Sequence, residues 1–244
     1  MVDDPRGASA HSDLPAGPPT GRRYGGLTPE ERRAARWARL TAAALELFSD
    51  QGYANTTIEG ICSTAGVTAR HFYEEFGSRE ELLRAVFDEA VDHATERILH
   101  ALAVATEQSL GLEASVRAGV DAFVHAFLDD PQRARIMCLE SIGVSAELEA
   151  HRREVIHAFA GILEADAHRF MDIDAIRHGD VVLTTRALVG GINEIVVDWI
   201  LDEDPPPLEM VARVTANMFL AVIGYRPGGW LPGAAGTSGP VSEP

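Results

Sequence analysis

The sequence predicts an all-α protein of about nine helices, in which a compact N-terminal group of three helices precedes a longer helical domain. Apolar residues recur at helical spacing nearly throughout the region between residues 28 and 225. No segment alternates apolar and polar residues over the length of a strand, and no Asn-Gly or Asp-Gly hairpin turn occurs. Four helix start signals fall within about fifty residues, which predicts closely packed helices at the N-terminal end.

Composition sets the outer limits of the interpretation. The 244 residues are 46% hydrophobic and 24% charged, which is typical of a globular protein. No apolar run reaches the roughly 18 residues of a membrane span, and the opening residues lack the pattern of an export signal. Cys62 and Cys138 lack metal-ligand spacing. We therefore expect a cytoplasmic protein with no membrane partner and no cofactor.

The two ends of the chain have a different composition from its middle. Residues 1–27 and 226–244 are rich in Pro, Gly, Ala and Ser and lack apolar periodicity. Such segments bury too little apolar surface to offset the entropy of ordering them. We expect a disordered N-terminal arm over 1–27 and a disordered tail over 226–244.

Capping signals predict the first four helices in order. Each start combines a Ser or Thr N-cap with proline or glutamate in the first turn, except the third, which has the N-cap alone: Thr28 with Pro29 and Glu31, Thr56 with Glu59, Thr68, and Ser78 with Glu81. Glycines mark the ends: Gly52, Gly66 and Gly77. The first helix should span about 29–51, and the third should end near Phe76.

Two short helices joined through Gly66 are typical of a helix-turn-helix motif, although a simple helical hairpin has the same turn. In the motif, side chains at the start of the second helix contact base edges and phosphates. Arg70 can bind guanine through two hydrogen bonds. The expected DNA-binding residues flank the turn and begin the helices around it: Thr56, Thr57, Thr68, Ala69, Arg70, His71, Tyr73 and Arg79.

The distribution of charge is compatible with this interpretation. The formal net charge is -16, yet residues 20–80 contain eight arginines and eight acidic residues. Attraction to phosphate depends on the local charge of the contacting surface. A neutral N-terminal part can therefore bind DNA while the acidic remainder faces away.

Residues from Arg33 through Phe87 resemble the N-terminal domain of the tetracycline-repressor (TetR) family. The matching positions are Ala43, Phe48, Gly52, Tyr53, Thr56, Thr57, Ile58, Ile61, Ala65, Gly66, Val67, Phe72, Tyr73, Phe76, Ser78, Arg79, Glu81, Leu82 and Leu83. The resemblance implies a homodimer that binds a pseudo-palindromic operator in double-stranded DNA and releases it when a small-molecule effector binds. It also implies base-reading positions at Thr68, Ala69, Arg70 and His71, and phosphate contacts from Tyr73 and Arg79.

Two features depart from that family pattern. Glu74 and Glu75 replace the basic, histidine or aromatic residues of many members, which should weaken attraction to phosphate. Affinity can then come from arginines near the N-terminal arm: Arg22, Arg23, Arg32, Arg33, Arg36 and Arg39. The first two suit an arm in the minor groove, and a solvated face of the first helix is the alternative for the cluster.

Five further helices are expected near 112–128, 131–141, 146–171, 175–202 and 207–224. The last two are apolar on more than one face, so they must be covered from two sides. A homodimeric four-helix interface supplies the second cover, and a wholly intramolecular core is the alternative. The expected interface residues are Val189, Ile192, Val196, Trp199, Val214 and Met218.

The middle helices mix aromatic and soft side chains with a few polar groups. Ligand pockets have this composition, and so do ordinary cores. The candidate pocket residues are Phe123, Phe127, Met137, Glu140, His157, Phe159 and Asn193. Glu140 and Asn193 are the most informative, because a polar group in an apolar helix needs a partner.

A metal-dependent helical enzyme is the second class of function considered. Glu89, His93, Glu96 and His100 share a helical face, Glu147, His151 and Glu154 repeat the spacing, and Glu154 with His157 forms one Glu-x-x-His pair. A di-iron site needs two Glu-x-x-His pairs with further inward glutamates, and one pair is present. We therefore expect a regulator rather than an enzyme, with no catalytic residues and no metal. Its DNA-binding domain should span 28–77 and its ligand-binding and dimerisation domain 78–225, and the regulator should be a ligand-released repressor.

Overall fold

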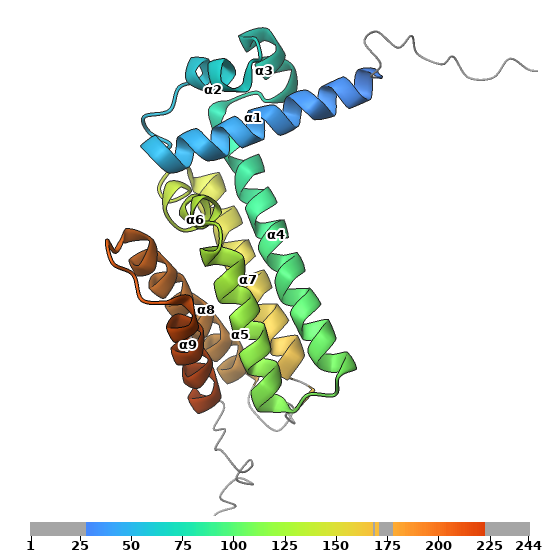
Figure 1. The fold of residues 1–244 in the computed structure, drawn as a ribbon, viewed down its shortest axis with the longest axis vertical. Helices are drawn as coiled ribbons and strands as arrows, with labels where there is room; N and C mark the ends of the chain where they lie inside the picture. Colours follow the sequence, from blue (N-terminus) through green and yellow to red (C-terminus); the bar gives the residue numbers. More distant parts are fainter. Residues whose placement is uncertain (1–27, 168, 171–177, 223–244) are drawn as a thin grey trace, which may run out of the picture.

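A computed structural model describes residues 28–167, 169–170 and 178–222. Within these ranges the chain forms nine α-helices and one π-helical turn, and no strand (Figure 1). The helices are α1 (Pro29–Gln51), α2 (Ile58–Ala65), α3 (Ala69–Glu75), α4 (Arg79–Glu107), α5 (Leu112–Leu128), α6 (Pro131–Arg135), α7 (Ala146–Ala167), α8 (His178–Leu201) and α9 (Leu208–Val222). The π-helical turn, η1, spans Ile136–Glu140 and follows α6 directly. The expected arm and tail lie outside the described residues.

Local capping explains where the N-terminal helices begin. The Thr28 hydroxyl accepts a hydrogen bond from the Glu31 amide, and the Glu31 carboxylate accepts one from the Thr28 amide, which completes a capping box. Ser78 caps α4 through the Glu81 amide in the same way. The predicted bounds of α1 and the predicted start of α4 are confirmed.

The second helix begins one residue later than the sequence predicts. Its N-cap is Thr57, whose hydroxyl accepts a hydrogen bond from the Gly60 amide at 3.1 Å. Thr56 is fully buried and forms hydrogen bonds within the domain instead. The expected capping box of Thr56 and Glu59 is therefore wrong, because packing of the preceding loop takes the Thr56 side chain away from the helix terminus.

The molecule divides into a head of α1 to α3 and a body of α4 to α9 (Figure 1). The long α4 runs from the head along the body, where it packs against α5 and α7. In the outer part of the body, α7 packs against α8 and α5 against α9. The short α6 and η1 contact α1, so they join the body to the head.

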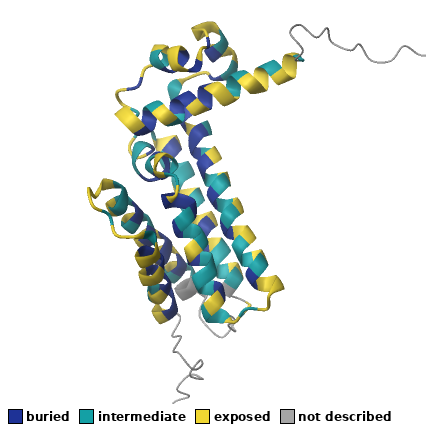
Figure 2. Ribbon diagram, in the orientation of Figure 1, coloured by how far each residue is buried: buried dark blue, intermediate teal, exposed yellow. Residues whose placement is uncertain are grey.

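Buried side chains form a continuous core through both parts (Figure 2). Phe48, Phe72 and Leu82 are fully buried where α1, α3 and α4 meet. Burying one such side chain contributes about 1.5–3 kcal/mol to folding. This packing fixes the orientation of α3 relative to α1 and α4.

Of the remaining predicted helices, the one at 112–128 is confirmed with its bounds, and the others are found with different ends. The segment expected at 131–141 is split into α6 and η1, because its backbone changes from α-helical to π-helical hydrogen bonding after Arg135. The ends expected at 171, 175 and 224 fall outside the described residues. In the part of the chain that the structure describes, no helix combines the length and apolarity that crossing a membrane requires.

Candidate functional site

The turn between α2 and α3 is held in a left-handed backbone conformation. Gly66 has φ 61° and ψ 38°, which strains any residue with a Cβ atom. The Val67 amide donates to the Cys62 carbonyl at 2.9 Å, and the Arg39 guanidinium reaches the Gly66 carbonyl at 3.5 Å. These contacts set the angle at which α3 leaves the turn.

The start of α3 presents polar side chains to solvent. The Arg70 side chain is 87% exposed and Tyr73 is 60% exposed. Thr68 and Ala69 are also exposed, and His71 lies beside them with Nδ1 3.1 Å from the Thr68 hydroxyl. The structure therefore brings these five predicted DNA-binding residues together on one surface, which we call the α3 face.

Acidic neighbours affect the α3 face in different ways. The Arg70 Nε donates to the Glu74 carboxylate at 3.1 Å, so Glu74 competes with an external partner of Arg70. Glu75 is 1% exposed and points inward, where it accepts hydrogen bonds from Arg33 and Arg36. The expected repulsion of phosphate by Glu75 is therefore wrong, because two arginines neutralise it inside the head.

The three other predicted DNA-binding residues occupy different environments. Thr57 is exposed at the N-terminus of α2. Thr56 is buried, with its hydroxyl donating to the Gly52 carbonyl at 2.9 Å, so it supports the surface from behind. The Arg79 guanidinium stacks 4.2 Å from the centre of the Tyr53 ring and donates to the Thr56 carbonyl. Arg79 thus binds the α1–α2 loop.

The arginine cluster of α1 is largely engaged within the head. Arg33 and Arg36 bind Glu75 at 2.7 and 3.0 Å, and Arg39 contacts the Ala35 and Gly66 carbonyls. Arg22 and Arg23, the candidates for an arm in the minor groove, lie outside the described residues.

Glu75 should contribute stability that depends on pH. Burial raises the pKa of its carboxyl, but the hydrogen bonds and charges of Arg33 and Arg36 outweigh burial, and the net pKa lies below the usual value. Because the pKa of Glu75 is lower in the folded state than in the unfolded state, the ionised carboxylate stabilises the protein at a pH above the unfolded-state pKa of about 4.3. This stabilisation is lost as the pH falls through the folded-state pKa. We expect Glu75→Gln to lower the free energy of unfolding by about 1–3 kcal/mol at pH 7.

Urea denaturation of both proteins from pH 7 to pH 3 measures this effect. The difference between wild type and Glu75→Gln should shrink as the wild-type carboxyl becomes protonated. Glu74→Gln is the matched control, because Glu74 is 43% exposed and should change stability by less than about 0.5 kcal/mol. A difference that stays constant across the pH range would contradict the assigned role of Glu75.

Glu140 lies at the junction of head and body. Its carboxylate accepts a hydrogen bond from the Tyr53 amide at 2.8 Å and one from the Arg135 Nε at 3.2 Å. It ends η1, whose other residues Met137 and Cys138 are buried in the body. The partner of Glu140 is thus a backbone amide of the head 87 residues away, and its role in a ligand pocket stays a prediction.

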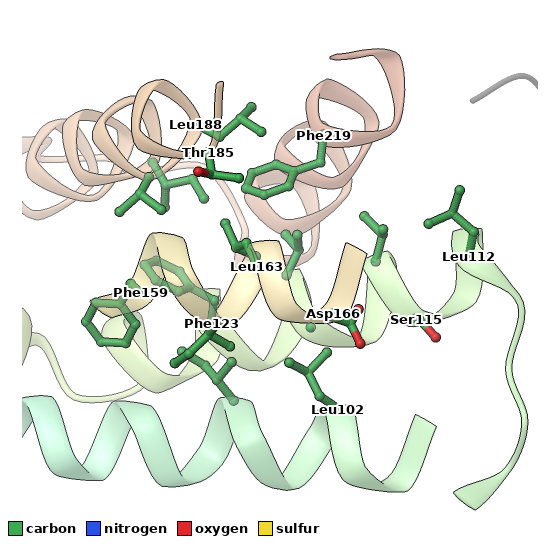
Figure 3. A pocket seen from close by; sticks show the side chains of 17 residues that line it. Leu102, Leu112, Ser115, Phe123, Phe159, Leu163, Asp166, Thr185, Leu188 and Phe219 are labelled. Carbon is green, nitrogen blue, oxygen red and sulfur yellow. The ribbon is translucent and has the colours of Figure 1, made fainter. Parts of the chain in front are cut away.

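A cavity of about 860 Å³, measured to its open mouth, lies within the body (Figure 3). Its walls come from α4, α5, α7, α8 and α9, and most of its side chains are apolar. Phe123 and Phe159 lie at one end of this main cavity, and Ser115 and Leu112 at the other (Figure 3). The Ser115 hydroxyl is fully buried and has no hydrogen-bond partner among the described residues.

A smaller cavity of about 440 Å³ lies beside it, between the main cavity and η1. Phe123, Phe159 and Val189 line both cavities. The predicted pocket residues Phe127, Met137 and Asn193 line the smaller one. The structure thus brings five of the seven predicted residues together.

His157 is exposed on α7 and lines neither of these two cavities, and its pocket role stays a prediction. The sequence analysis also missed residues that line the cavities, including Arg152, Thr185, Leu188 and Phe219. For Leu188 and Phe219 the apolar spacing on α8 and α9 was available as a signal, but it does not tell which apolar face surrounds an empty volume, and no local signal indicates Arg152.

The predicted dimer residues do not share one exposed surface. Val189, Ile192 and Val196 are at most 4% exposed because they pack inside the chain's own core. Trp199 is partly buried, and its indole Nε1 donates to the Pro206 carbonyl at 2.8 Å. Of the predicted set, Val214 is exposed and Met218 is half-buried.

The exposed apolar surface of α8 and α9 includes one member of that predicted set, Val214. Its large exposed side chains are Leu183, Leu201, Met210, Val214 and Val222. Gly190 and Gly191 are exposed on the same helix as Leu183, and a Cβ atom added to Gly190 would meet nothing within 4 Å. We call this surface the α8–α9 face. Monomeric proteins seldom expose so many large apolar residues together.

The metal-enzyme alternative is not supported. Across the described residues, no group of three or more His, Cys, Asp or Glu side chains is placed to hold a metal ion. His151 instead pairs with Asp88 at 2.5 Å and with Glu154 at 3.6 Å, and Glu154 is 79% exposed. His93, Glu96 and His100 line an open surface depression between α4 and α5.

Comparison with known proteins agrees with the arrangement of head and body. The profile of the family described as "Bacterial regulatory proteins, tetR family" matches residues 40–86. The chain is 28% identical over 174 residues to the HTH-type transcriptional activator FasR of Mycolicibacterium smegmatis, covering 63% of this chain and 78% of FasR. It is 23% identical over 199 residues to the fatty acid metabolism regulator protein of Bacillus subtilis, covering 80% and 97%.

A solved structure shares the fold. The transcriptional regulator FadR from Bacillus subtilis, in complex with stearoyl-CoA, superimposes with a TM-score of 0.64 at 20% identity. The superposition covers 78% of this chain and all of that structure. The all-α prediction with an N-terminal helix-turn-helix is confirmed.

Proposed function

Because this chain belongs to the TetR family of bacterial transcriptional regulators, we propose that it binds an operator as a homodimer and releases it when a small-molecule effector fills the body. The observation that carries the proposal is the α3 face, which presents Arg70 and Tyr73 to solvent beside a rigid left-handed turn. A recognition helix needs exposed hydrogen-bonding side chains at its start and a fixed angle to its support. The protein then acts in the cytoplasm as a repressor and performs no catalysis.

Each part of the molecule has one task in this proposal. Residues 28–77 bind DNA, and residues 78–225 bind the effector and the second subunit. Thr57, Thr68, Ala69, Arg70, His71 and Tyr73 contact the operator, and Arg79 positions the α1–α2 loop behind them. The α8–α9 face pairs with its copy around a two-fold axis, which suits an isologous interface.

The main cavity supports an effector with a substantial apolar part. Its walls are mostly apolar side chains with a few polar groups, which is the composition of ligand pockets. The relative of known structure is in complex with stearoyl-CoA, a molecule with a long acyl chain. We propose that the effector binds best to the conformation in which the two α3 helices are wrongly spaced for successive major grooves.

Selection of bound fragments from random genomic DNA, followed by sequencing, tests the regulator function. We expect enrichment of one pseudo-palindrome whose half-site centres lie about one helical turn, or a multiple of it, apart. Affinity should fall steeply across a salt series, because phosphate contacts release counterions. Enrichment of no sequence at any salt concentration would refute the proposed function.

Arg70 and Tyr73 should affect operator binding in different ways. Arg70→Ala should lose roughly 1–3 kcal/mol of binding free energy and relax specificity at one base-pair position. Tyr73→Phe should weaken specific and random DNA alike, because a phosphate contact carries no sequence information. Fluorescence anisotropy with operators altered at single positions measures both. Arg153→Ala is the control, because Arg153 is exposed on α7 in the body. Equal losses on specific and random DNA for Arg70→Ala would remove its base-reading role.

A further inference from the structure

The smaller cavity is lined by a cationic side chain, whereas the charged residue that lines the main cavity is the carboxylate of Asp166. It is bounded by η1, α7 and α8 together with Phe87 of α4 and two phenylalanines of α5. Arg152 and Asn193 line it together with apolar side chains and Cys138. Within the described part of the chain, Arg152 is the one charged residue that lines either this cavity or its contact with the main cavity.

Arg152 is buried and incompletely satisfied. Its side chain is 12% exposed, and its Nη1 donates to the Glu149 carboxylate at 3.2 Å. Its Nε is fully buried and has no hydrogen-bond partner among the described residues. A buried guanidinium N–H without an acceptor is costly, which favours binding of an acceptor from outside the chain.

The groups around Arg152 do not supply that acceptor. Burial raises the pKa of the Cys138 thiol to about 12, although the charge of Arg152 opposes this shift, so the thiol is neutral at pH 7. Glu149 is 30% exposed and also accepts a hydrogen bond from the Gly143 amide at 2.8 Å. Glu149 therefore binds the Nη1 side of the guanidinium and leaves Nε available.

Asn193 adds a second unused donor. No described residue forms a hydrogen bond with its side-chain amide, and the amide lines the same cavity as Arg152. Both residues line the same cavity, and an amide N–H and a guanidinium N–H can each donate to one oxygen of a carboxylate. Because Arg152 already pairs with Glu149, a ligand with one negative charge adds less uncompensated charge to the cavity than a phosphate dianion would.

The two cavities adjoin at a cluster of aromatic rings. Phe123 stacks on Phe127 with ring centres 4.4 Å apart, and Phe159 packs edge-on against both at 5.9 and 6.0 Å. Phe123 and Phe159 line both cavities, so these side chains and Val189 form the boundary. A molecule that crosses this boundary places an apolar part in the main cavity and a polar end beside Arg152.

We propose that the smaller cavity is the carboxylate subsite of the effector site, in which Arg152 and Asn193 bind the head of an amphipathic monocarboxylic acid whose apolar chain occupies the main cavity. The inference rests on the proposed effector function of the body. The ligand then has a free carboxylate. Its carboxylate end points towards η1 and the domain of α1 to α3, and the end of its apolar chain points towards Ser115.

Isothermal titration calorimetry with three matched series tests the subsite: straight-chain carboxylates from hexanoate to octadecanoate, the corresponding alcohols, and the corresponding acyl-CoA thioesters. In wild type we expect the best carboxylate to bind at least about tenfold more tightly than its alcohol, since a charge-assisted hydrogen bond contributes more than a neutral one. In Arg152→Met this preference should fall to about one, with the alcohol affinity unchanged. Arg153→Met, which removes the exposed neighbouring charge, should keep the wild-type preference.

Two further variants keep the test decisive if Arg152→Met does not fold. Asn193→Asp should weaken the carboxylate at least about tenfold and spare the alcohol, because it places a like charge beside the head. Arg152→Lys keeps the charge without the Nε donor and should give an intermediate preference.

Several results would overturn the inference. They are equal affinity of wild type for carboxylate and alcohol, tighter binding of the thioester than of the free acid, and no binding by any carboxylate. Operator binding is measured on the same preparations. If wild type selects an operator but shows no carboxylate preference, the subsite assignment fails and the regulator function stands. If no operator is selected, the regulator function fails irrespective of the calorimetry.

Discussion

Replacing Val214 with aspartate should convert the dimer to a monomer and lower operator affinity by on the order of 10³-fold or more. Val214 is 51% exposed on α9 and belongs to the α8–α9 face with Leu183 and Met210. A charge buried at that interface without a partner loses its hydration and receives no compensation. A monomer contacts one half-site, so it loses the binding energy that the second half-site supplies.

Sedimentation equilibrium and operator anisotropy measure the two effects. Leu99→Asp is the matched control, because Leu99 is 49% exposed on α4, away from α8 and α9. It introduces the same charge at an equally exposed apolar position and should leave the protein dimeric. A Val214→Asp protein that sediments as a dimer would show that the subunits meet elsewhere.

Val214 is a better test of the interface than Val196 or Trp199. Val196 is 1% exposed, so a polar substitution there disrupts the chain's own core whether or not a dimer forms. Trp199 binds the Pro206 carbonyl through its indole N–H, so its replacement loosens the α8–α9 connection. Loss of the dimer in either variant would report on folding and not on the interface.

Glu140→Ala should uncouple the body from the head. The substitution removes the acceptor of the Tyr53 amide, and Tyr53 stacks against Arg79 at the start of α4. A hydrogen bond to a charged group contributes about 1.5–3 kcal/mol, so exchange of the Tyr53 amide with solvent deuterium should accelerate roughly 10- to 100-fold. Operator release by a saturating effector should decline, while operator and effector affinities measured separately stay close to wild type.

Hydrogen exchange of residues 52–57 gives a readout that requires no effector. The best carboxylate of the calorimetric series then serves as the effector in an anisotropy assay of operator release. Glu140→Gln should fall between wild type and Glu140→Ala, because the amide retains an acceptor oxygen and loses the charge. Glu147→Gln, at an exposed position of α7, is the control. An unchanged rate of hydrogen exchange at the Tyr53 amide in Glu140→Ala would refute the proposed link between the body and the head.

The route of this link follows contacts between named elements. Met137 and Cys138 of η1 line the smaller cavity, and Glu140 ends the same π-helical turn at the head. π-helical turns are frequent at functional positions, because their backbone is less regularly bonded than that of an α-helix. A ligand that shifts η1 therefore acts on the loop that supports α2 and α3.

The sequence by itself determined the helices and the type of head domain. Caps such as Thr28 and Ser78 and the left-handed turn at Gly66 are set by residues within four positions of one another, so they can be recognised without the fold. The exposed side chains of the α3 face were predicted for the same reason. The position of Thr56 was not, because the loop folds back so that the Thr56 hydroxyl donates to the carbonyls of Leu47 in α1 and of Gly52 at its C-cap.

Tertiary structure alone decided which face of α8 is buried and where each isolated polar residue finds its partner. Helix α8 carries apolar residues on several of its faces, so their spacing is compatible with either an interface or a core position for Val189 and Ile192. The structure places both in the core. Glu140 reaches Tyr53 across 87 positions and Glu75 reaches Arg33 across 42. The periodicity of apolar residues indicates which face of a helix is buried. The hydrogen-bond partner of a polar residue, when it is distant in the chain, depends instead on how whole helices pack. The unsatisfied guanidinium Nε of Arg152 became visible for that reason, once the cavity around it was formed by five different segments.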